Sequence, residues 1–360
     1  MRESAGLSFG VFLLSFGLGW VIFRAIEVSF NVFAWILIIA GAAVVVSALF
    51  SWGRPRLSIS GIVGALTGGL ILSLIVTSGF SFIGDISGID WGGIGGTYRA
   101  EGTRTFEGDV ATNMVYFEVD NRNGPIRVST WDKSEYSVEL TIRAKGSTDS
   151  DAERTIEGLN IDLVEQVSQG QLRLVLDYDI SSEIWRRLSI EVTAVLPAEA
   201  EIDLDLESSN GGIYLSEILG DTVIIETSNG PMDLDGVYVE RLTGSTSNGR
   251  IEGVIEAKDT SLSTSNGGID LTIPCTVSGE YDLGTSNGGI ELTVSPSQQV
   301  GYDLDLSTSN GNIDLNLPDL DYSTNQRTSK EARTMDFAGR SVQITIEADT
   351  SNGDIDIDTS

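Results

Sequence analysis

Hydrophobic and polar residues alternate along most of the chain after residue 97, and a short Ser/Thr-Ser-Asn-Gly motif interrupts the alternation again and again. The fullest copy, TSNGGIDL, stands at 264–271, and its variants are SSNGGIYL, TSNGPMDL, TSNGRIEG, TSNGGIEL, TSNGNIDL and TSNGDIDI. Successive side chains of a strand point to opposite faces, so a period of two predicts half-buried strands. The sequence therefore predicts an all-β region built from repeats.

The repeats have a nearly constant length. Their asparagines are separated by 19, 19, 18, 21, 23 and 42 residues, and the last spacing is about two periods. A period near 20 residues is typical of a solenoid, in which each unit buries its apolar face only against its neighbours. We predict that the asparagines are structural corners of the repeat: Asn210, Asn229, Asn248, Asn266, Asn287, Asn310 and Asn352.

The buried face changes parity at each Asn-Gly. Apolar residues lie at even offsets before the asparagine and at offsets of three and five after it, with an acidic residue between them in six copies. The chain must turn there, and we expect the corner to need a positive φ, which Gly with a preceding Asn tolerates. A type I′ hairpin would explain the parity, and so would a solenoid corner that stacks like residues about 4.8 Å apart. The recurrence of Ser, Asn and Ile at matching offsets favours the solenoid, although a hairpin meander stays open.

We predict that residues 98–200 form a first, non-repetitive β section that begins the solenoid. This section has its own Asn123-Gly124 corner and one short helix within STDSDAERTIEGL. Residues 201–360 form the predicted repeat solenoid. The sequence ends at DIDIDTS without a cap signal, so we expect an uncapped last rung whose edge is open to a partner or to a second copy.

Three apolar stretches precede the β region, at 7–23, 32–50 and 57–80, with 17, 19 and 24 residues. At about 1.5 Å per residue, helices of this length cross a hydrocarbon core of about 30 Å. We therefore predict three transmembrane α-helices in a membrane anchor at 1–83, followed by a Gly-rich tether at 84–97. Arg54 and Arg56 place the connector between the second and third spans in the cytoplasm. The N-terminus is then cytoplasmic and the β region extracytoplasmic, in a multi-pass protein whose first partner is the lipid bilayer.

Charge narrows the set of partners. The chain has 52 acidic and 22 basic residues, and nearly all of the excess acid lies after residue 83. A surface of this charge repels phosphates, so nucleic acid is not an expected partner. Few of the cations are lysines, which is typical of a salt-adapted protein and equally of an acidic stalk at a cell surface.

Little in the composition predicts catalysis. The chain has no histidine and one cysteine, so imidazole chemistry and an intramolecular disulfide are excluded. We interpret Cys275 as a small buried hydrophobe, and the repeated serines have no base to activate them. We expect no enzyme activity, no cofactor and no metal. Alternating acids such as Asp354, Asp356 and Asp358 leave calcium open, and a solvated acidic face is the preferred interpretation.

The repeat breaks down in one segment, PDLDYSTNQRTSKEARTMDFAGR at 318–340. Cations cluster there: Arg327, Lys330, Arg333 and Arg340. Insertions into repeats often carry function, so this segment is a candidate contact site for a ligand or partner; the alternative is a simple surface excursion.

The opening residues Phe117 and Val119, the NGPIRV and WD motifs that follow, and the serial TSNGGIDL copies resemble the putative-adhesin β-strand-repeat family, a domain family of unknown function. The resemblance covers about residues 100–360 and implies a right-handed β-helix outside the cytoplasm. We therefore expect a membrane-anchored β-solenoid with a binding or structural role at the cell surface. The alternatives are a β-helical enzyme acting on surface polysaccharide and an envelope sensor coupled to a membrane partner.

Overall fold

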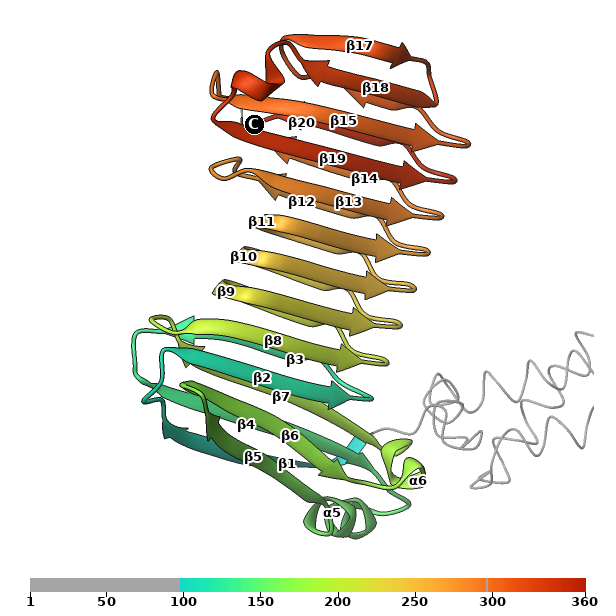
Figure 1. Cartoon of the computed structure of the whole chain (residues 1–360). Coiled ribbons are helices and arrows are strands. Elements are labelled where there is room, and N and C mark those ends of the chain that lie inside the picture. Colours follow the sequence, from blue (N-terminus) through green and yellow to red (C-terminus); the bar gives the residue numbers. More distant parts are fainter. Residues whose placement is uncertain (1–97, 296) are drawn as a thin grey trace, which may run out of the picture. The chain divides into compact units, whose positions relative to one another are not determined.

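Strands dominate the residues that the computed structural model describes, which are 98–295 and 297–360 (Figure 1). The strands are β1 (Tyr98–Asp109), β2 (Met114–Asn121), β3 (Ile126–Trp131), β4 (Glu135–Lys145), β5 (Asn160–Ser168), β6 (Gln171–Asp179), β7 (Leu188–Pro197), β8 (Glu201–Ser208), β9 (Ile213–Thr227), β10 (Met232–Thr246), β11 (Ile251–Thr264), β12 (Ile269–Ile273), β13 (Gly279–Thr285), β14 (Ile290–Val294), β15 (Val300–Thr308), β16 (Ile313–Leu315), β17 (Leu320–Asn325), β18 (Ser329–Thr334), β19 (Val342–Thr350) and β20 (Ile355–Thr359). The helical elements are α5 (Asp149–Glu157), α6 (Ser182–Trp185) and the 3-10 turn η1 (Phe337–Gly339).

The strands form one hydrogen-bonded network that folds into two layers. The first layer runs β5–β6–β2–β8–β9–β10–β11–β13–β19–β15–β18–β17. The second layer runs β1–β4–β7–β3–β9–β10–β11–β12–β14–β20–β16. Pairing is parallel from β6 to β15 in the first layer and from β7 to β16 in the second. Consecutive repeats are therefore rungs of a solenoid, and the hairpin alternative is wrong for them.

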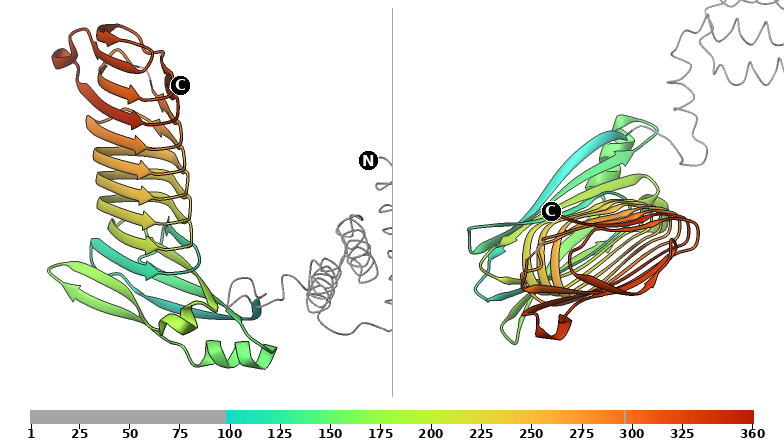
Figure 2. Two further views of the ribbon diagram at one scale, coloured as in Figure 1. Left: turned by 90° about the vertical axis from the view of Figure 1, so that its right-hand side faces the viewer. Right: turned by 90° about the horizontal axis from the view of Figure 1, so that it is seen from above.

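Long strands connect the two layers. The first half of β9 pairs with β3 in the second layer, where Ile213 lies beside Ile126, and its second half pairs with β8 in the first layer, where Val223 lies beside Leu204. The chain thus passes from the first layer to the second at an Asn-Gly corner. It returns to the first layer within the long strand that follows, and the next rung starts there. Viewed from above, the rungs superpose as flattened coils (Figure 2).

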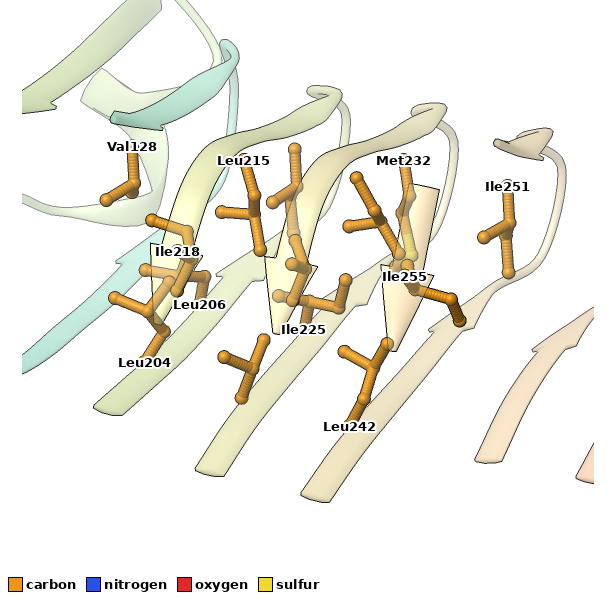
Figure 3. Close-up of a cluster of buried hydrophobic side chains, with 14 of the residues drawn as sticks. Val128, Leu204, Leu206, Leu215, Ile218, Ile225, Met232, Leu242, Ile251 and Ile255 are labelled. Carbon is orange, nitrogen blue, oxygen red and sulfur yellow. The ribbon is translucent and has the colours of Figure 1, made fainter. Parts of the chain in front are cut away.

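The core fills the space between the layers (Figure 3). Leu206 and Ile225 approach from the first layer, Leu215 and Met232 from the second, and all four are buried. The apolar residue three positions after each corner asparagine forms one column in parallel register: Ile126, Ile213, Met232, Ile251, Ile269, Ile290, Ile355 and Ile313. Burial of like side chains in adjacent rungs explains why the sequence repeats the same apolar residue at the same offset.

The order of the rungs departs from the order of the sequence near the C-terminus. The last repeat, β19 and β20, lies between the rung of β13 and β14 and the rung of β15 and β16. The prediction of an uncapped last rung is therefore wrong, because β20 has a neighbouring strand on each side. The long spacing of 42 residues arises because β16 is followed by the hairpin β17–β18 and by η1 before the chain re-enters the stack.

Both ends of the first layer finish in antiparallel strands. The hairpin β5–β6 closes one end, and β18 pairs with β15 and β17 at the other. We call residues 318–340 the C-terminal cap. In the second layer β4 pairs antiparallel with β7, and β1 with β4. The helix α5 begins at Thr148, whose hydroxyl accepts the Asp151 amide at 3.1 Å, and it packs on β1 and β4. Antiparallel strands thus cover the parallel rungs at both ends of the first layer, and β5 and β17 become its edge strands.

The predicted fold class needs one correction. We predicted three transmembrane helices before the solenoid, but no helix in residues 98–360 is long and apolar enough to cross a membrane, and α5, the longest, has nine residues. The stretches at 7–23, 32–50 and 57–80 lie outside the described residues. Apolar length alone led to the prediction, and it does not specify a helical backbone. The fold supported here is an all-β solenoid.

Candidate binding site at the C-terminal cap

The seven predicted corner asparagines, together with Asn123, stack into one ladder. The side-chain amide of each of the seven donates to the Oδ1 atom of the preceding asparagine in the stack at 2.8–3.0 Å, while the Asn123 amide donates to the Trp185 carbonyl. The order in the stack is Asn123, Asn210, Asn229, Asn248, Asn266, Asn287, Asn352 and Asn310. Each of the seven amides also donates to a backbone carbonyl of the neighbouring rung at 3.2–3.3 Å. These amide groups hold the rungs together and have no hydrogen left to offer a ligand.

A second ladder lies inside the corner, two residues before each asparagine. The Thr264 hydroxyl donates to the Gly249 carbonyl of the neighbouring rung at 2.9 Å and accepts the Gly267 amide of its own corner at 3.1 Å. The same pair of bonds recurs at Ser208, Thr227, Thr246 and Thr285. Because these hydroxyls are buried and already bonded, they satisfy corner backbone groups and are not nucleophiles.

The corner glycines are required by crowding between rungs. A Cβ atom on Gly267 would lie 1.8 Å from the carbonyl oxygen of Gly249, and the corresponding distances in the other repeats are 1.7–1.9 Å. These glycines are Gly211, Gly230, Gly249, Gly288, Gly311 and Gly353. Among the corner glycines only Gly124 has a positive φ in the left-handed range, 120°. Our expectation that the corner needs a positive φ is therefore wrong for the repeats, where close stacking of backbones is the cause.

The acidic outer faces form rows without converging on a metal site. Glu291, Asp356 and Asp314 lie side by side in register on the second layer. Burial raises the pKa of Asp356 above its usual range, and the neighbouring carboxylates raise it further. Within residues 98–295 and 297–360, no group of three or more acidic, cysteine or histidine side chains is placed to hold a metal ion.

Cys275 is buried, with 5% of its surface exposed. Burial raises the pKa of its thiol to about 11, so the thiol is protonated at neutral pH. A protonated, inaccessible thiol is a packing group.

The four predicted cations of the cap have different environments. The guanidinium group of Arg327 donates to the Gly311 carbonyl, and that of Arg340 donates to the Gln298 carbonyl, so both fasten the cap to the stack. Lys330 lies in β18 opposite Leu306 of β15. Arg333 forms an ion pair with Asp303 and lies over the Phe337 ring, with its Cζ atom 5.4 Å from the ring centroid. The structure does not gather the four cations at one point, and of the four Arg333 lines the cavity between β15, β17, β18, β19 and η1.

That cavity, which we call the cap cavity, has a volume of about 960 Å³. Strands β15, β17, β18 and β19 and the turn η1 line it. Its apolar surface includes Tyr322, Met335 and Phe337, and the Met335 side chain is 60% exposed. Its acidic residues are Asp303, Asp305, Asp321, Glu331, Asp336 and Glu347. A cavity of this size that combines exposed apolar groups with charge is suited to binding.

Two rows of charged residues cross the cap cavity. In the first row Arg333 stands between Asp303 and Asp321 on the neighbouring strands. In the second row Asp305 stands between Glu331 and Glu347, and none of these three carboxylates has an ion-pair partner within the described residues. Burial raises the pKa of Asp305, and the carboxylates of Glu331, Asp349 and Asp303 add to the effect. The first row has one cation for its two carboxylates, whereas the second row is purely acidic.

Most of the lining residues were not singled out from the sequence. Tyr322, Met335 and Phe337 belong to the segment where the repeat fails, and a cluster of large apolar residues in a polar insertion could have marked them. Asp305 and Glu347 occupy ordinary solvent-facing positions of two repeats. They reach the cavity only because the last rung inserts next to β15, which no local pattern specifies.

The family of the chain follows from its repeats. Residues 116–358 match the model of the Toastrack family DUF4097. This match covers more than half of the 360 residues, and the chain belongs to that family. No curated protein matches the sequence.

Several solved structures are similar over most of the chain. A putative cell adhesion protein from Clostridium sporogenes is 10% identical and has a TM-score of 0.35, with 72% of this chain and 100% of the other covered. A putative adhesin from Bacteroides fragilis is 12% identical, with a TM-score of 0.34 and coverage of 73% and 100%. A putative lipid binding protein from Parabacteroides distasonis is 13% identical, with a TM-score of 0.30 and coverage of 72% and 96%.

Proposed function

We propose that this chain is a non-catalytic binding protein of the cell surface. In this proposal the apolar segment 1–83 attaches it to the membrane, the solenoid is a rigid extracytoplasmic spacer, and the cap cavity contacts the partner. The observation that carries the proposal is the division of labour between stack and cap. The side chains of the repeated Ser/Thr-Ser-Asn-Gly motif form hydrogen bonds between rungs, whereas the cap cavity combines about 960 Å³ of space with exposed apolar and charged groups.

A purely structural role for the cap would leave its exposed apolar groups unexplained. Closing the end of the stack requires buried contacts, and Leu306 and Ala332 provide them. Met335 is 60% exposed in the cavity and contributes little to that closure. Large exposed apolar groups beside a cavity are typical of contact sites, since solvent exposure costs free energy that binding recovers.

A pair of matched variants tests this function in cells that make the full-length chain. Met335→Asp introduces charge into the cap cavity, while Leu219→Asp makes the same change at an equally exposed position, 60%, on β9 of the stack. We expect Met335→Asp to lower adhesion to a layer of deletion-strain cells to the level of the deletion strain itself. Leu219→Asp should leave adhesion unchanged, and immunoblots must show equal amounts of each protein. Equal adhesion of the deletion strain and the wild type would refute the proposal.

Two further experiments test the same proposal. Protease added to intact cells should cleave the solenoid, because we place it outside the cytoplasm, and full protection would contradict that placement. Release of reducing ends from surface polysaccharide by the wild type, and not by a cap variant, would count against a non-catalytic role.

A further inference from the structure

The cap cavity already contains one bound guanidinium group, that of its own Arg333. This group is held by the Asp303 carboxylate on one side and by the Phe337 ring, 5.4 Å from Cζ to the centroid, on the other. A carboxylate paired with an aromatic face is a favourable site for a cation, because both the charge and the ring quadrupole attract it. The cavity therefore shows, within the chain itself, how it accommodates an arginine side chain.

The second row of the cavity also consists of carboxylates on adjacent strands, but no cation stands among them. Asp305 is in register with Glu331 on one side and Glu347 on the other, so the three carboxylates occupy adjacent strands about 4.8 Å apart. Glu331 accepts a hydrogen bond from the Ser323 hydroxyl at 2.9 Å, and no lysine or arginine pairs with the row in the described part of the chain. Since like charges at this spacing repel, an incoming positive group gains the full attraction of the row.

Metal is a poor candidate for that positive group. The described residues contain no cluster of ligands with the geometry of a metal site, and Tyr322, Met335 and Phe337 give the same cavity an apolar surface that a hydrated metal ion would not use. An organic cation suits both the carboxylates and the apolar surface of the cavity, because its charged head contacts the carboxylates and its aliphatic stem covers the apolar groups.

The border of the cavity favours a polypeptide as the carrier of that cation. Strand β17, which contributes Asp321, Tyr322 and Ser323 to the lining, pairs with β18 alone among the described strands. Its other edge, which lies two strands away from Asp305 in the order β15–β18–β17, offers backbone donors and acceptors to an extended segment that borders the cavity. A volume of about 960 Å³ is at the large end for ligand pockets and has room for several side chains.

We propose that the cap cavity binds an extended, basic segment of a partner polypeptide, with an arginine or lysine side chain on the row of Asp305, Glu331 and Glu347 and an apolar neighbour against Met335 and Phe337. This inference rests on the proposed function, for which it names the chemistry of the partner. The charge of the whole chain, −30, draws basic segments toward it, and the cavity adds the specific contacts.

The test measures binding of a fluorescent peptide of alternating leucine and arginine, six residues long, to the full-length chain by anisotropy at 0.15 M salt. The comparison peptide has glutamine in place of each arginine. One variant removes the row (D305N, E331Q and E347Q). A matched variant removes the same charge from exposed positions at the opposite end of the first layer (D162N, D177N and E201Q). Thermal melting establishes that both variants are folded.

We expect the row variant to weaken binding of the arginine peptide at least tenfold, and the matched variant to weaken it less than twofold. The glutamine peptide should bind at least tenfold more weakly to the wild type. Equal weakening by the two variants would overturn the inference, since it would show general attraction to an acidic surface. Equal affinity for the two peptides, or no binding of the arginine peptide, would overturn it as well.

The outcomes also separate this inference from the proposed function. If Met335→Asp abolishes cell adhesion and the arginine peptide does not bind, the function stands and the chemistry assigned to the partner is wrong. If the peptide binds through the row but adhesion does not depend on the chain, the cavity is a peptide site and the adhesive function is wrong.

Discussion

The stack and the C-terminal cap are built from the same kinds of strand but use their side chains differently. In the stack, the corner Asn266 bonds to Asn248 below and Asn287 above, and Thr264 is bonded to backbone on both sides. In the cap, strands run antiparallel, Met335 is exposed and the carboxylate row around Asp305 has no ion-pair partner among the described residues. In the repeats, the polar side chains of the corners are engaged in hydrogen bonds between rungs. Side chains that are available to a partner lie in the cap, where the repeat ends.

The sharpest way to break the stack is to separate two rungs at a corner. Gly267→Ala would place a Cβ atom 1.8 Å from the Gly249 carbonyl oxygen, so the rungs must move apart; we expect a loss of about 3 kcal/mol in the free energy of unfolding. Gly284→Ala, in β13, is the control, because its Cβ would lie 3.9 Å from the nearest neighbour, Ser263. Urea unfolding of the full chain measures both. A loss in Gly284→Ala as large as that in Gly267→Ala would contradict the crowding argument.

A smaller difference in the free energy of unfolding between two threonine variants would sharpen the comparison. Thr264→Val removes a hydroxyl that makes two buried hydrogen bonds, and we expect a cost of about 2 kcal/mol. Thr260→Val removes a hydroxyl that is equally buried but has no partner among the described residues, so unfolding free energy should stay equal or rise by up to about 1 kcal/mol. The same urea titrations decide the point, and destabilisation of both variants alike would show that the ladder bonds contribute nothing special.

The smallest effect concerns the acidic face. Because the pKa of Asp356 is raised in the folded state, that state binds the proton more tightly than the unfolded chain does, and stability rises as pH falls through the raised pKa. We expect Asp356→Asn to stabilise the protein at pH 7 by less than about 1 kcal/mol, with a smaller gain at pH 5. Asp162→Asn, an exposed change on β5, is the control for charge alone. A loss of stability in Asp356→Asn at pH 7 would contradict the repulsion argument.

The sequence was a good guide to the stack because the stack is local and periodic. The offset of Ile269 from Asn266 reports a buried column, and the acid between Ile269 and Leu271 reports a solvent-facing position. Every rung repeats this information, so an error at one copy, such as Gly253, does not obscure the pattern. The reason for the glycines was missed, since contacts between rungs are not visible in the chemistry of one copy.

The cap was harder to predict because its contacts join residues far apart in the chain. Asp305 meets Glu347 only when the last rung inserts beside β15, and a row of single acids in separate repeats carries no local signal. The cluster of Arg327, Lys330, Arg333 and Arg340 correctly drew attention to 318–340 as a distinct segment. A role of the four cations in binding stays a prediction, and two of them, Arg327 and Arg340, also fasten the cap to the stack.

The inserted last rung has a consequence for biosynthesis. A ribosome releases β15 and β16 before β19 and β20, although β19 and β20 stand between β15 and β16 and the earlier rungs. The nascent solenoid can therefore lengthen rung by rung only as far as β14, and the cap must wait until the final residues emerge. A premature stop before residue 342 would not merely shorten the stack; it would remove the rung that joins β15, β16 and the cap to the earlier rungs.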